Sequence, residues 1–351
     1  MNAVAGKIYI VLVNWNGAKD TLECLESVLR LDYPDFQVIV CDNDSQDGSV
    51  ERIVAWANGA SGEVAAQNSV LDHLVRPNVS KPVSVEVLSR ADSAAEGRMT
   101  SSAKIVVIPT GANLGFAAAN NIAMKYASSL GNFAYFWLLN NDTVVESSAL
   151  SALVRRARIS SDRGVVGSTL VFYHQPEEIQ AMGVFGYSSS CALGIPVGAF
   201  RRPESITFHD KEHAESVAAY VVGASMLVPR TFYLEVGGMC EDYFLYFEEI
   251  DWALRGAPFG FACLYAPGSI VFHKSGASTS RSAEKKFGAS ARLAYQNRIR
   301  FTLKFYPEKL NLVRCSIVAE ACRAVLSGGW DEFWFALRVG LFYADRGNFD
   351  R

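Results

Sequence analysis

The sequence predicts an α/β fold in which a mostly parallel central sheet is flanked by helices, followed by a helical C-terminal extension. Two patterns predict the sheet. Short β-branched runs at residues 8–13 and 37–41 each end in a polar turn, and apolar residues at helical spacing follow each turn. The same alternation resumes at residue 105 and continues to residue 159. Strands that alternate with helices form a parallel sheet, because each helix carries the chain back to the start of the next strand.

The composition is that of a globular protein. Half of the 351 residues are hydrophobic, which is enough to bury one large core or two smaller ones. The formal net charge of −3 gives no reason to expect nucleic acid as a partner, because nucleic-acid binders carry a pronounced basic excess. The N-terminus lacks the pattern of a signal peptide, and no apolar run reaches the roughly 18 residues of a membrane span. We therefore expect a cytoplasmic protein whose seven scattered cysteines are small buried side chains.

The first two strand and helix pairs are expected within residues 8–57. Residues 8–13 form a buried strand, and Asp20 is expected to cap the helix that follows it. Residues 37–41 form the second strand, and a second amphipathic helix follows. Between 58 and 104 the pattern breaks into a Ser-, Ala- and Asn-rich stretch with one hint of a strand, which we interpret as an insertion within the domain.

The alternation continues after this insertion. The expected elements are strand 105–108, helix 116–128, strand 133–139, helix 147–159, apolar segments 165–172 and 217–228, helix 248–255, and strands 259–265 and 269–272. We therefore expect one α/β domain over residues 1–280 and a helical segment over residues 281–351.

The C-terminal segment is locally basic. Between Arg281 and Arg314 there are nine basic and two acidic residues, a balance of +7, with five aromatic residues interleaved. This pattern suits a surface that meets anionic lipid head groups or a phosphorylated acceptor, and it equally suits a solvated basic helix with its aromatic side chains in the core. The apolar residues within 330–343 recur at helical spacing, and we expect that helix to pack on the protein in preference to lying in a membrane interface.

Polar side chains follow three of the expected strands at the point where each strand ends. These clusters are residues 14–16, 42–44 and 140–142. Because the carboxyl ends of parallel strands meet at one edge of a sheet, we expect the three clusters to form one ligand site, although each alone would be ordinary turn chemistry. Asp142 and its neighbouring asparagines offer the oxygen ligands that Mg²⁺ and Mn²⁺ prefer. The segment 111–116 leads into a helix, so its backbone N–H groups could approach a phosphate.

Six motifs stand in order along the chain. They are residues 11–17 (VLVNWNG), 42–48 (DNDSQDG), 111–117 (GANLGFA), 137–143 (WLLNNDT), 237–238 (GG) and 243–252 (YFLYFEEIDW). With these motifs the sequence resembles the family 2 glycosyltransferases, and especially their bacterial rhamnosyltransferase-like branch. The resemblance extends from residue 8 to about residue 307 and implies the GT-A fold of that family.

The resemblance implies a nucleotide-sugar site at the strand ends. Trp15 and Asp42 would flank the nucleotide base, by stacking and by hydrogen bonding to its edge, and Asn113 would lie near the ribose or the phosphates. Asn140 and Asp142 stand where the family's DxD acids hold a divalent metal, Mg²⁺ or Mn²⁺, although the first acid is replaced by asparagine. The other residues expected at the donor are Val13, Asn16, Asn43, Gly115 and Asn141.

Three further positions come from the same resemblance. His273 stands where relatives often place a histidine near the metal or the diphosphate, whereas a lone histidine after a strand is otherwise structural. Glu249 aligns with the acid that deprotonates the acceptor hydroxyl, and Glu248 and Asp251 remain alternatives for this base. Arg298 is a candidate ligand for a phosphate of the acceptor, and a role on the helix surface is equally compatible with it.

The resemblance therefore implies an inverting, metal-dependent glycosyltransferase. Its expected donor is dTDP-rhamnose, with UDP-hexoses as the alternative. Its expected acceptor is a polyprenyl-diphosphate-linked saccharide at the inner face of the cell membrane, in surface polysaccharide assembly. A sugar nucleotidyltransferase would carry a Gly-rich cationic loop after the first strand, and residues 14–17 contain no cation. A non-catalytic sugar- or lipid-binding relative stays open, although it would have little use for Asp142 together with the acidic run.

Overall fold

The computed structural model describes residues 6–95, 101–274, 288–326 and 329–343. The strands are β1 Lys7–Asn14, β2 Phe36–Asp42, β3 Val85–Val87, β4 Ile105–Pro109, β5 Phe133–Asn140, β6 Thr143–Val145, β7 Gly164–Phe172, β8 Gln175–Ala181, β9 Val184–Ser188, β10 Leu193–Pro196, β11 Tyr220–Val221, β12 Ser225–Pro229 and β13 Ala262–His273. The α-helices are α1 Ala18–Val28, α2 Ser49–Ala57, α3 Asp72–Val75, α4 Arg90–Ser93, α5 Gly115–Ser129, α6 Ala149–Ile159, α7 Phe208–Val217, α8 Arg230–Val236, α9 Glu248–Gly256, α10 Ala289–Phe305, α11 Leu310–Leu326 and α12 Trp330–Phe342.

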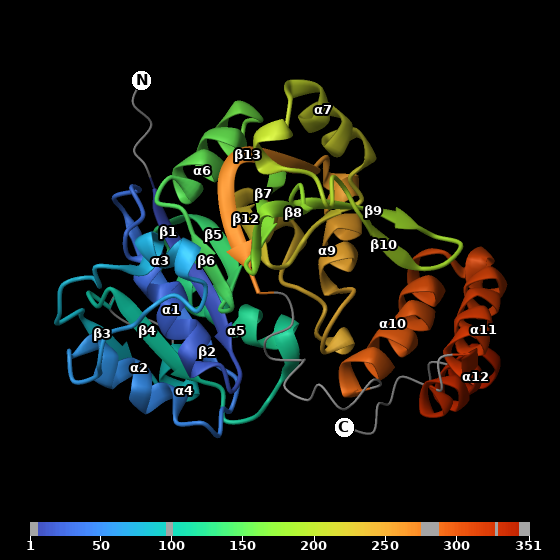
Figure 1. Cartoon of the computed structure of the whole chain (residues 1–351), viewed down its shortest axis with the longest axis horizontal. Coiled ribbons are helices and arrows are strands. Elements are labelled where there is room, and N and C mark those ends of the chain that lie inside the picture. The colour runs from blue at the N-terminus through green and yellow to red at the C-terminus, as the bar shows by residue number, and fades with distance from the viewer. Residues whose placement is uncertain (1–5, 96–100, 275–287, 327–328, 344–351) are drawn as a thin grey trace.

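A mixed sheet forms the centre of the molecule (Figure 1). Within the described residues it has ten strands in the order β3-β4-β2-β1-β5-β12-β7-β13-β6, with β8 beside β7. The strands from β3 to β5 run parallel to one another, and β13 runs parallel to β7. Only part of the sheet is antiparallel, including β12, which opposes both β5 and β7. The prediction of a mostly parallel central sheet flanked by helices is therefore confirmed.

Different helices cover the two faces of this sheet. On one face, Leu25 of α1 and Trp56 of α2 pack in a cluster that includes Leu12 of β1. On the other face, α5 and α9 pack in a second cluster that includes Val11 of β1 and Trp252. Val11 and Leu12 belong to different clusters because successive side chains of a strand point to opposite faces. A strand that is buried on both faces reads as a continuous apolar run, which is the pattern of residues 8–13.

The stretch between β7 and β12 contains elements that the sequence pattern did not predict. β9, β10 and β11 form a second, antiparallel sheet of three strands, and β8 joins the central sheet. All four residues of β10 are exposed, so this strand lacks the alternation that marks a half-buried strand. The two strands expected at 259–265 and 269–272 are instead one strand, β13, whose register shifts between Ala266 and Ile270.

The expected insertion leaves the sheet and then rejoins it. It contains α3, α4 and β3, and β3 pairs with β4 to become one edge of the sheet. Leu71 and Val75 from this insertion are buried against Val144, Tyr173 and Phe272. The insertion thus covers the end of the sheet where β6 and β13 pair.

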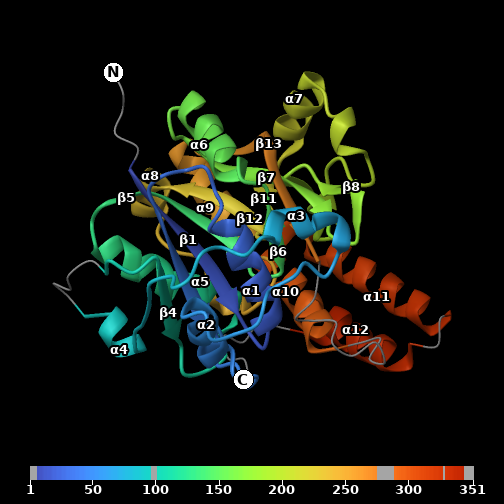
Figure 2. The same cartoon turned by 60° about the vertical axis from the view of Figure 1, so that its left-hand side comes forward.

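The C-terminal helices α10, α11 and α12 lie together at one end of the molecule (Figure 1, Figure 2). Ile299, Val313 and Val339 are buried in a small core between them, so α12 packs on the protein as expected. Among the described residues, no helix is long and apolar enough to cross a membrane. All seven cysteines are free, but Cys315 and Cys322 are exposed on α11, which corrects the expectation that all seven are buried.

Two basic residues in the described part of the basic segment are buried in the fold. Arg298 and Arg300 are buried, and Lys304 forms an ion pair with the buried carboxylate of Asp251. Arg298 and Arg300 therefore do not contribute to a lipid- or phosphate-facing surface, whereas Arg292 and Lys304 of the same helix are exposed. The remaining basic residues at the start of the segment lie outside the described residues, namely Arg281, Lys285 and Lys286.

A buried ion cluster replaces the expected helix cap. α1 begins at Ala18, and Asp20 lies inside its first turn without capping it. Nζ of Lys274 lies 2.7 Å from Oδ1 of Asp20 and 2.6 Å from Oε2 of Glu23, and all three side chains are buried. The cap prediction is wrong because Asp20 pairs with a lysine far along the chain. The backbone N–H of Lys274 also donates to the carbonyl of Asp142 at 3.0 Å, so the cluster anchors the end of β13 beside that residue.

We expect Lys274→Met to destabilise the protein by about 3–5 kcal/mol, because it leaves two buried carboxylates without their cation. Equilibrium unfolding in urea measures this difference. Lys19→Met is the matched control, because Lys19 is an exposed lysine of α1, the helix that carries Asp20 and Glu23. Its effect on the free energy of unfolding should stay within about 0.5 kcal/mol. An equal stability of the two variants would contradict a stabilising role of the cluster.

Candidate active site

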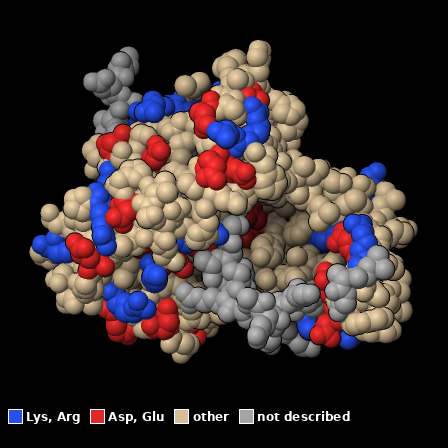
Figure 3. All heavy atoms as spheres, in the orientation of Figure 1, with Lys and Arg blue, Asp and Glu red and all other residues tan. Residues whose placement is uncertain are grey.

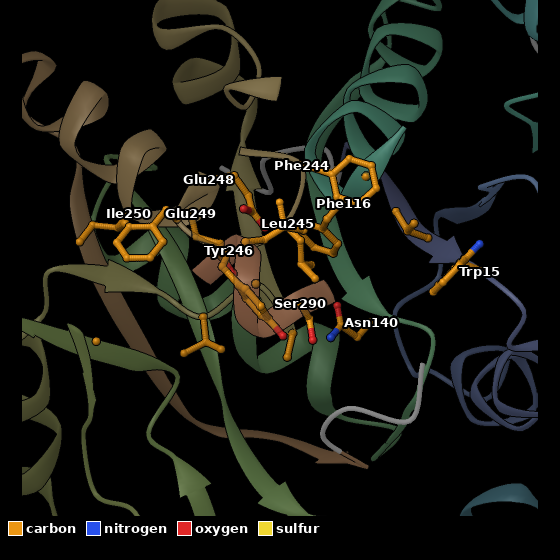
Figure 4. A pocket seen from close by; sticks show the side chains of 18 of the residues that line it. Trp15, Phe116, Asn140, Phe244, Leu245, Tyr246, Glu248, Glu249, Ile250 and Ser290 are labelled. Carbon is orange, nitrogen blue, oxygen red and sulfur yellow. The ribbon is translucent and has the colours of Figure 1, made fainter. Parts of the chain in front are cut away.

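One cavity of about 800 Å³ opens at the carboxyl ends of β1 and β5. Its walls include most of the residues singled out from the sequence, namely Val13, Trp15, Asn43, Asn113, Gly115, Asn140, Asn141, Asp142, Glu248, Glu249 and His273. Asn16, Asp42, Asp251 and Arg298 do not line it. Figure 4 shows Trp15 and Asn140 on one side, Glu248 and Glu249 on the other, and Tyr246 and Ser290 between them. Segments that are far apart in the sequence therefore meet at one site.

The strand ends are locked together by side-chain amides. Nδ2 of Asn14 donates to Oδ1 of Asp42 at 2.7 Å, while Oδ1 of Asn14 accepts from Thr21 and from Nδ2 of Asn141. The other carboxylate oxygen of Asp42 accepts the backbone N–H of Ser45 at 3.0 Å. Asp42 is buried and both of its oxygens are engaged. Asp42 therefore organises the loops that carry other residues into the cavity, and its expected contact with a nucleotide base stays a prediction.

Trp15 and Asn16 follow β1 and differ in what they can reach. The Trp15 side chain is 39% exposed and lines the cavity, so an aromatic face is available for stacking. Oδ1 of Asn16 instead accepts the backbone N–H of Gln46 at 2.7 Å, outside the cavity lining. Asn16 therefore joins two loops, and its expected place at the donor is corrected.

The loop that precedes α5 is held from two sides. Oδ1 of Asn43 accepts the N–H of Leu114 at 3.0 Å, and Nδ2 of Asn43 donates to Oδ1 of Asn113 at 2.9 Å. Gly115 has a φ of +83°, and a Cβ at that position would lie 2.3 Å from the carbonyl oxygen of Phe244, so only glycine fits there.

The first backbone N–H groups of α5 already have acceptors within the protein. That of Gly115 donates to Oδ1 of Asn113 at 3.1 Å, and that of Phe116 donates to the carbonyl of Phe244 at 2.7 Å. Because the N–H of Leu114 is also engaged, the backbone N–H groups of residues 114–116 already have acceptors within the protein. What the segment presents to the cavity is its side chains.

Asp142 and His273 face each other at the base of the cavity. β6 pairs with β13 so that His273 lies opposite Thr143, which places the imidazole beside Asp142. Nε2 of His273 lies 3.3 Å from Oδ1 of Asp142 and 3.3 Å from Nδ2 of Asn140. Both Asp142 and His273 are buried. Two residues more than 130 positions apart are thus brought together by the pairing of two strands.

Gln180 on β8 orients the histidine, and it could not be identified from the sequence because β8 itself was not predicted. Its Oε1 lies 2.8 Å from Nδ1 of His273. The imidazole is thus held between the Gln180 amide at Nδ1 and the side chains of Asn140 and Asp142 at Nε2. A carboxylate, an imidazole nitrogen and an amide group converging on one point fit a divalent cation. The described residues contain no cluster of three or more His, Cys, Asp or Glu side chains, so a cation would need further oxygens from a ligand.

Two adjacent carboxylates begin α9 on the opposite wall. Glu248 is buried, and its Oε2 has no hydrogen-bond partner among the described residues. Burial raises the pKa of both carboxyls, and the neighbouring charge of Glu249 raises that of Glu248 well above its usual range. Gly223 leaves the space for Glu249, because a Cβ there would lie 2.5 Å from Oε1. The pair is therefore poised to hold a proton in the cavity.

The turn before these carboxylates has an unusual backbone. Phe244, Tyr246 and Phe247 have φ angles of 62°, 69° and 78°, which non-glycine residues rarely adopt and which cost of order 1–3 kcal/mol each. The buried Asn297 of α10 stabilises this turn: its Nδ2 donates to the carbonyls of Tyr243, Leu245 and Tyr246 at 2.9, 2.9 and 3.1 Å. Asn297 stands in the segment 295–298 beside Arg298, but the sequence assigned it no role, because nothing local indicates which carbonyls a helical asparagine will reach.

Asp251 and Arg298 lie outside the cavity for clear electrostatic reasons. Asp251 is fully buried and accepts from Arg255, Lys304 and the Tyr243 hydroxyl. Because this carboxylate is neutralised by two cations away from the cavity, it is no longer a candidate base. Arg298 is buried and pairs with both carboxylate oxygens of Glu320. Its proposed contact with an acceptor phosphate is corrected in the same way, because the guanidinium is already engaged.

The small sheet supplies an aromatic wall that the sequence did not reveal. Phe185 and Tyr187 of β9 and Tyr220 of β11 line the cavity together with Tyr246 and Phe247. Burial raises the pKa of Tyr220, and the neighbouring Glu249 carboxylate adds to this effect, so the hydroxyl stays protonated. Aromatic faces beside a pair of carboxylates suit a ring-shaped ligand with hydroxyl groups.

Comparisons with known proteins identify the family of the chain. The family described as "Glycosyltransferase like family 2" matches residues 5–293. N-acetylglucosaminyl-diphospho-decaprenol L-rhamnosyltransferase of Mycobacterium tuberculosis is 23% identical over 231 residues, which are 61% of this chain and 74% of that protein. The same protein from a second strain matches to the same extent.

Solved structures extend the likeness to the fold. GalNAc-T7 with UDP, GalNAc and Mn2+ has a TM-score of 0.56 and 14% identity, covering 95% of this chain and 55% of that chain. S. aureus TarS 1-349 in complex with UDP-GlcNAc has a TM-score of 0.51 and 11% identity, covering 95% of this chain and 80% of that chain. At such identities these structures establish the fold alone, which is the GT-A fold of glycosyltransferases. Since the family match spans most of the chain, this protein belongs to glycosyltransferase family 2.

Proposed function

We propose that the protein is an inverting, metal-dependent glycosyltransferase that moves a sugar from a nucleoside-diphosphate donor to a hydroxyl of a saccharide acceptor. The observation that carries the proposal is the opposition of two sets of side chains across one cavity. The strand ends carry Asn140, Asp142 and His273, and the opposite wall carries Glu248 and Glu249. A leaving diphosphate at the first set and an acceptor hydroxyl at the second would lie on opposite sides of the anomeric carbon, which is the geometry of inversion.

The nucleotide is expected to bind at the rim formed by Trp15 and the loop before α5. Trp15 would stack on the base, and Asn113 would hydrogen-bond the ribose or a phosphate. Val13, Asn43 and Asn141 line the same part of the cavity, and Asn43 fixes the Asn113 side chain. The UDP and GalNAc in the GalNAc-T7 structure and the UDP-GlcNAc in the TarS structure support a donor of this class.

The diphosphate end of the donor is expected to lie beside Asp142. Mg²⁺ or Mn²⁺, when bound there, would neutralise the charge that develops on the departing diphosphate. Asp142 would hold it with its carboxylate, His273 with Nε2, and Asn140 with its amide oxygen. With a single carboxylate in this set, the donor phosphates would supply the further oxygens. The Mn2+ in the GalNAc-T7 structure supports this class of cofactor.

Glu249 is the proposed base. Its carboxylate lies beside the aromatic wall, where an acceptor sugar would stack, and it would remove the proton of the attacking hydroxyl. Glu248 has its pKa raised further, so it holds a proton while Glu249 is ionised. Such a division of roles follows from two adjacent carboxyls that cannot both be charged in a buried site.

The donor sugar and the acceptor are proposed from the curated relative. That protein is named as an L-rhamnosyltransferase acting on N-acetylglucosaminyl-diphospho-decaprenol. We propose dTDP-rhamnose as the donor here and a polyprenyl-diphosphate-linked saccharide as the acceptor, in surface polysaccharide assembly at the inner face of the cell membrane. Residues 1–280 would form the catalytic domain and residues 281–351 a segment that faces the membrane or the acceptor.

Incubation of the purified protein with a panel of nucleotide sugars tests this function. We expect nucleoside diphosphate to be released in a reaction that requires Mg²⁺ or Mn²⁺ and a saccharide acceptor, with the product anomer opposite to that of the donor by NMR. Retention of the anomeric configuration would exclude the proposed mechanism. Release of pyrophosphate from a nucleoside triphosphate and a sugar phosphate would instead identify a nucleotidyltransferase.

The proposal gives Asn297 a measurable part in catalysis. Asn297→Leu removes three hydrogen bonds to the turn that precedes Glu248, so the carboxylates lose their position. We expect kcat to fall about a hundredfold, the cost of a misplacement of about 1 Å, while KM for the donor changes little. Asn78→Leu is the matched control, because Nδ2 of Asn78 likewise donates to two loop carbonyls but within the insertion. Equal kcat values for the two folded variants would contradict this role of Asn297.

A further inference from the structure

The outward faces of α11 and α12 are apolar, whereas a helix at the surface of a globular protein is normally polar on its outer side. On α12 the side chains of Trp330, Trp334 and Leu341 recur at helical spacing, and Phe342 lies at the end of the helix. Their exposed fractions range from 50% to 77%. In Figure 3 the right-hand edge of the molecule, over these two helices, consists mainly of uncharged residues.

Neither helix needs its outward face for the fold. Val313 and Ile317 of α11 and Ala336 and Val339 of α12 already fill the small core against α10. On α11 the exposed residues are again mostly apolar or weakly polar, namely Leu312, Cys315, Ala319 and Cys322 beside Asn311 and Arg323. The two helices are therefore apolar both on the side that faces the small core and on the side that faces outward. An apolar outward side indicates a contact with a further apolar surface outside the described fold.

The two glutamates of this helix pair face the protein, whereas Arg338 and Asp331 of α12 are exposed. Glu320 and Glu332 bind Arg298 and Tyr295 of α10, so these acids point inward. Arg338 is exposed one turn beyond Trp334, and no carboxylate among the described residues pairs with it. The single exposed acid of the described α12 is Asp331, in the first turn, where it complements the helix dipole. Tryptophan and arginine on one helix face are the combination favoured at the surface of an anionic bilayer.

The position of α11 and α12 relative to the cavity also favours a contact with a bilayer. α10 contributes Ser290 and Leu293 to the cavity wall, and its Ile299 packs in the core shared with α11 and α12. The 17-residue helix α10 therefore connects the cavity wall to the core beneath α11 and α12. A saccharide carried on a polyprenyl diphosphate keeps its lipid in the membrane, so a cavity that serves it has to lie close to the bilayer.

We propose that the outward face of α12, formed by Trp330, Trp334, Arg338, Leu341 and Phe342, docks on a membrane that contains anionic lipid. The argument that the cavity has to lie close to a bilayer rests on the proposed function, because it assumes a lipid-linked acceptor. The face itself is defined by exposure and charge.

Co-sedimentation with vesicles tests the docking. The full-length protein should bind vesicles of phosphatidylcholine mixed with phosphatidylglycerol more tightly than vesicles of phosphatidylcholine alone. Trp330→Ala/Trp334→Ala should weaken binding at least about tenfold, because two interfacial anchors are lost. Arg338→Glu should weaken binding about tenfold on the anionic vesicles only, because attraction becomes repulsion. Phe208→Ala is the matched control, since Phe208 is an aromatic residue, 68% exposed, on the distant helix α7.

Two further measurements decide between the outcomes. Light scattering after size exclusion reports a second copy of the chain: a dimer that the double substitution dissociates, with vesicle binding unchanged, would overturn the proposal. So would a failure of the wild-type protein to bind anionic vesicles. Transfer to a water-soluble acceptor without vesicles should be equal in all variants. Its absence in the wild type would refute the proposed function while leaving the vesicle result to stand by itself.

Discussion

Asp142→Asn is expected to lower kcat about a thousandfold, because a cation site that stabilises a departing diphosphate contributes several kcal/mol and each factor of ten in rate corresponds to about 1.4 kcal/mol. The substitution keeps the size of the side chain and removes its charge. The carboxylate lies 3.3 Å from Nε2 of His273, and asparagine at both 140 and 142 would leave no carboxylate in this set. Steady-state release of nucleoside diphosphate, with Mn²⁺ varied, measures the effect.

The loss should be accompanied by weaker metal binding in an intact fold. Isothermal titration with Mn²⁺ in the presence of nucleoside diphosphate reports the affinity, and far-UV circular dichroism with thermal unfolding reports the fold. Asp44→Asn is the matched control, because Asp44 is an exposed acid at the neighbouring strand end and does not line the cavity. Turnover of Asp142→Asn at the wild-type rate would refute the assignment of the metal site.

Glu249→Gln is the second substitution with a large expected effect. General bases contribute about a hundred- to ten-thousandfold to rate, so kcat should fall within that range while the donor still binds. The isosteric amide keeps the shape of the wall beside Gly223 and cannot accept a proton. Rates of transfer at saturating donor and acceptor measure this loss. Glu248→Gln should be less damaging, because Glu248 holds a proton when the site is active.

The pH dependence follows from the raised pKa of this carboxyl. Burial raises the pKa of Glu249, so the carboxylate is protonated and inactive below that pKa and ionised above it. The acid limb of kcat/KM should therefore lie above the range of an exposed glutamate, with the rate falling as the pH drops through it. If Glu248→Gln abolished transfer while Glu249→Gln retained it, Glu248 would be the base.

Much of the fold could be predicted from local pattern. Continuous apolar runs identified β1, β2, β4 and β5, because a strand buried on both faces leaves no room for polar residues. The same method missed β8, β9 and β10, whose residues are largely exposed or mixed. It also misassigned Asp20. Aspartate is a residue type favoured at helix N-caps, but this one lies inside α1 and pairs with Lys274. Local sequence reports burial and turn chemistry, whereas pairing partners depend on segments that meet only after folding.

Some residues of the candidate site could likewise be predicted from the sequence, whereas others became clear only from the tertiary structure. The sequence by itself placed Trp15, Asn140, Asp142 and the acidic run, because strand ends in a parallel sheet and a family motif both mark positions along the chain. Only the tertiary structure showed that Asp251 is neutralised by two cations and that Asn297 holds the turn before the base. The physical reason is that a carboxylate acts as ligand, base or structural ion according to its neighbours. Those neighbours come from β13, α9 and α10, which sequence order separates and packing brings together.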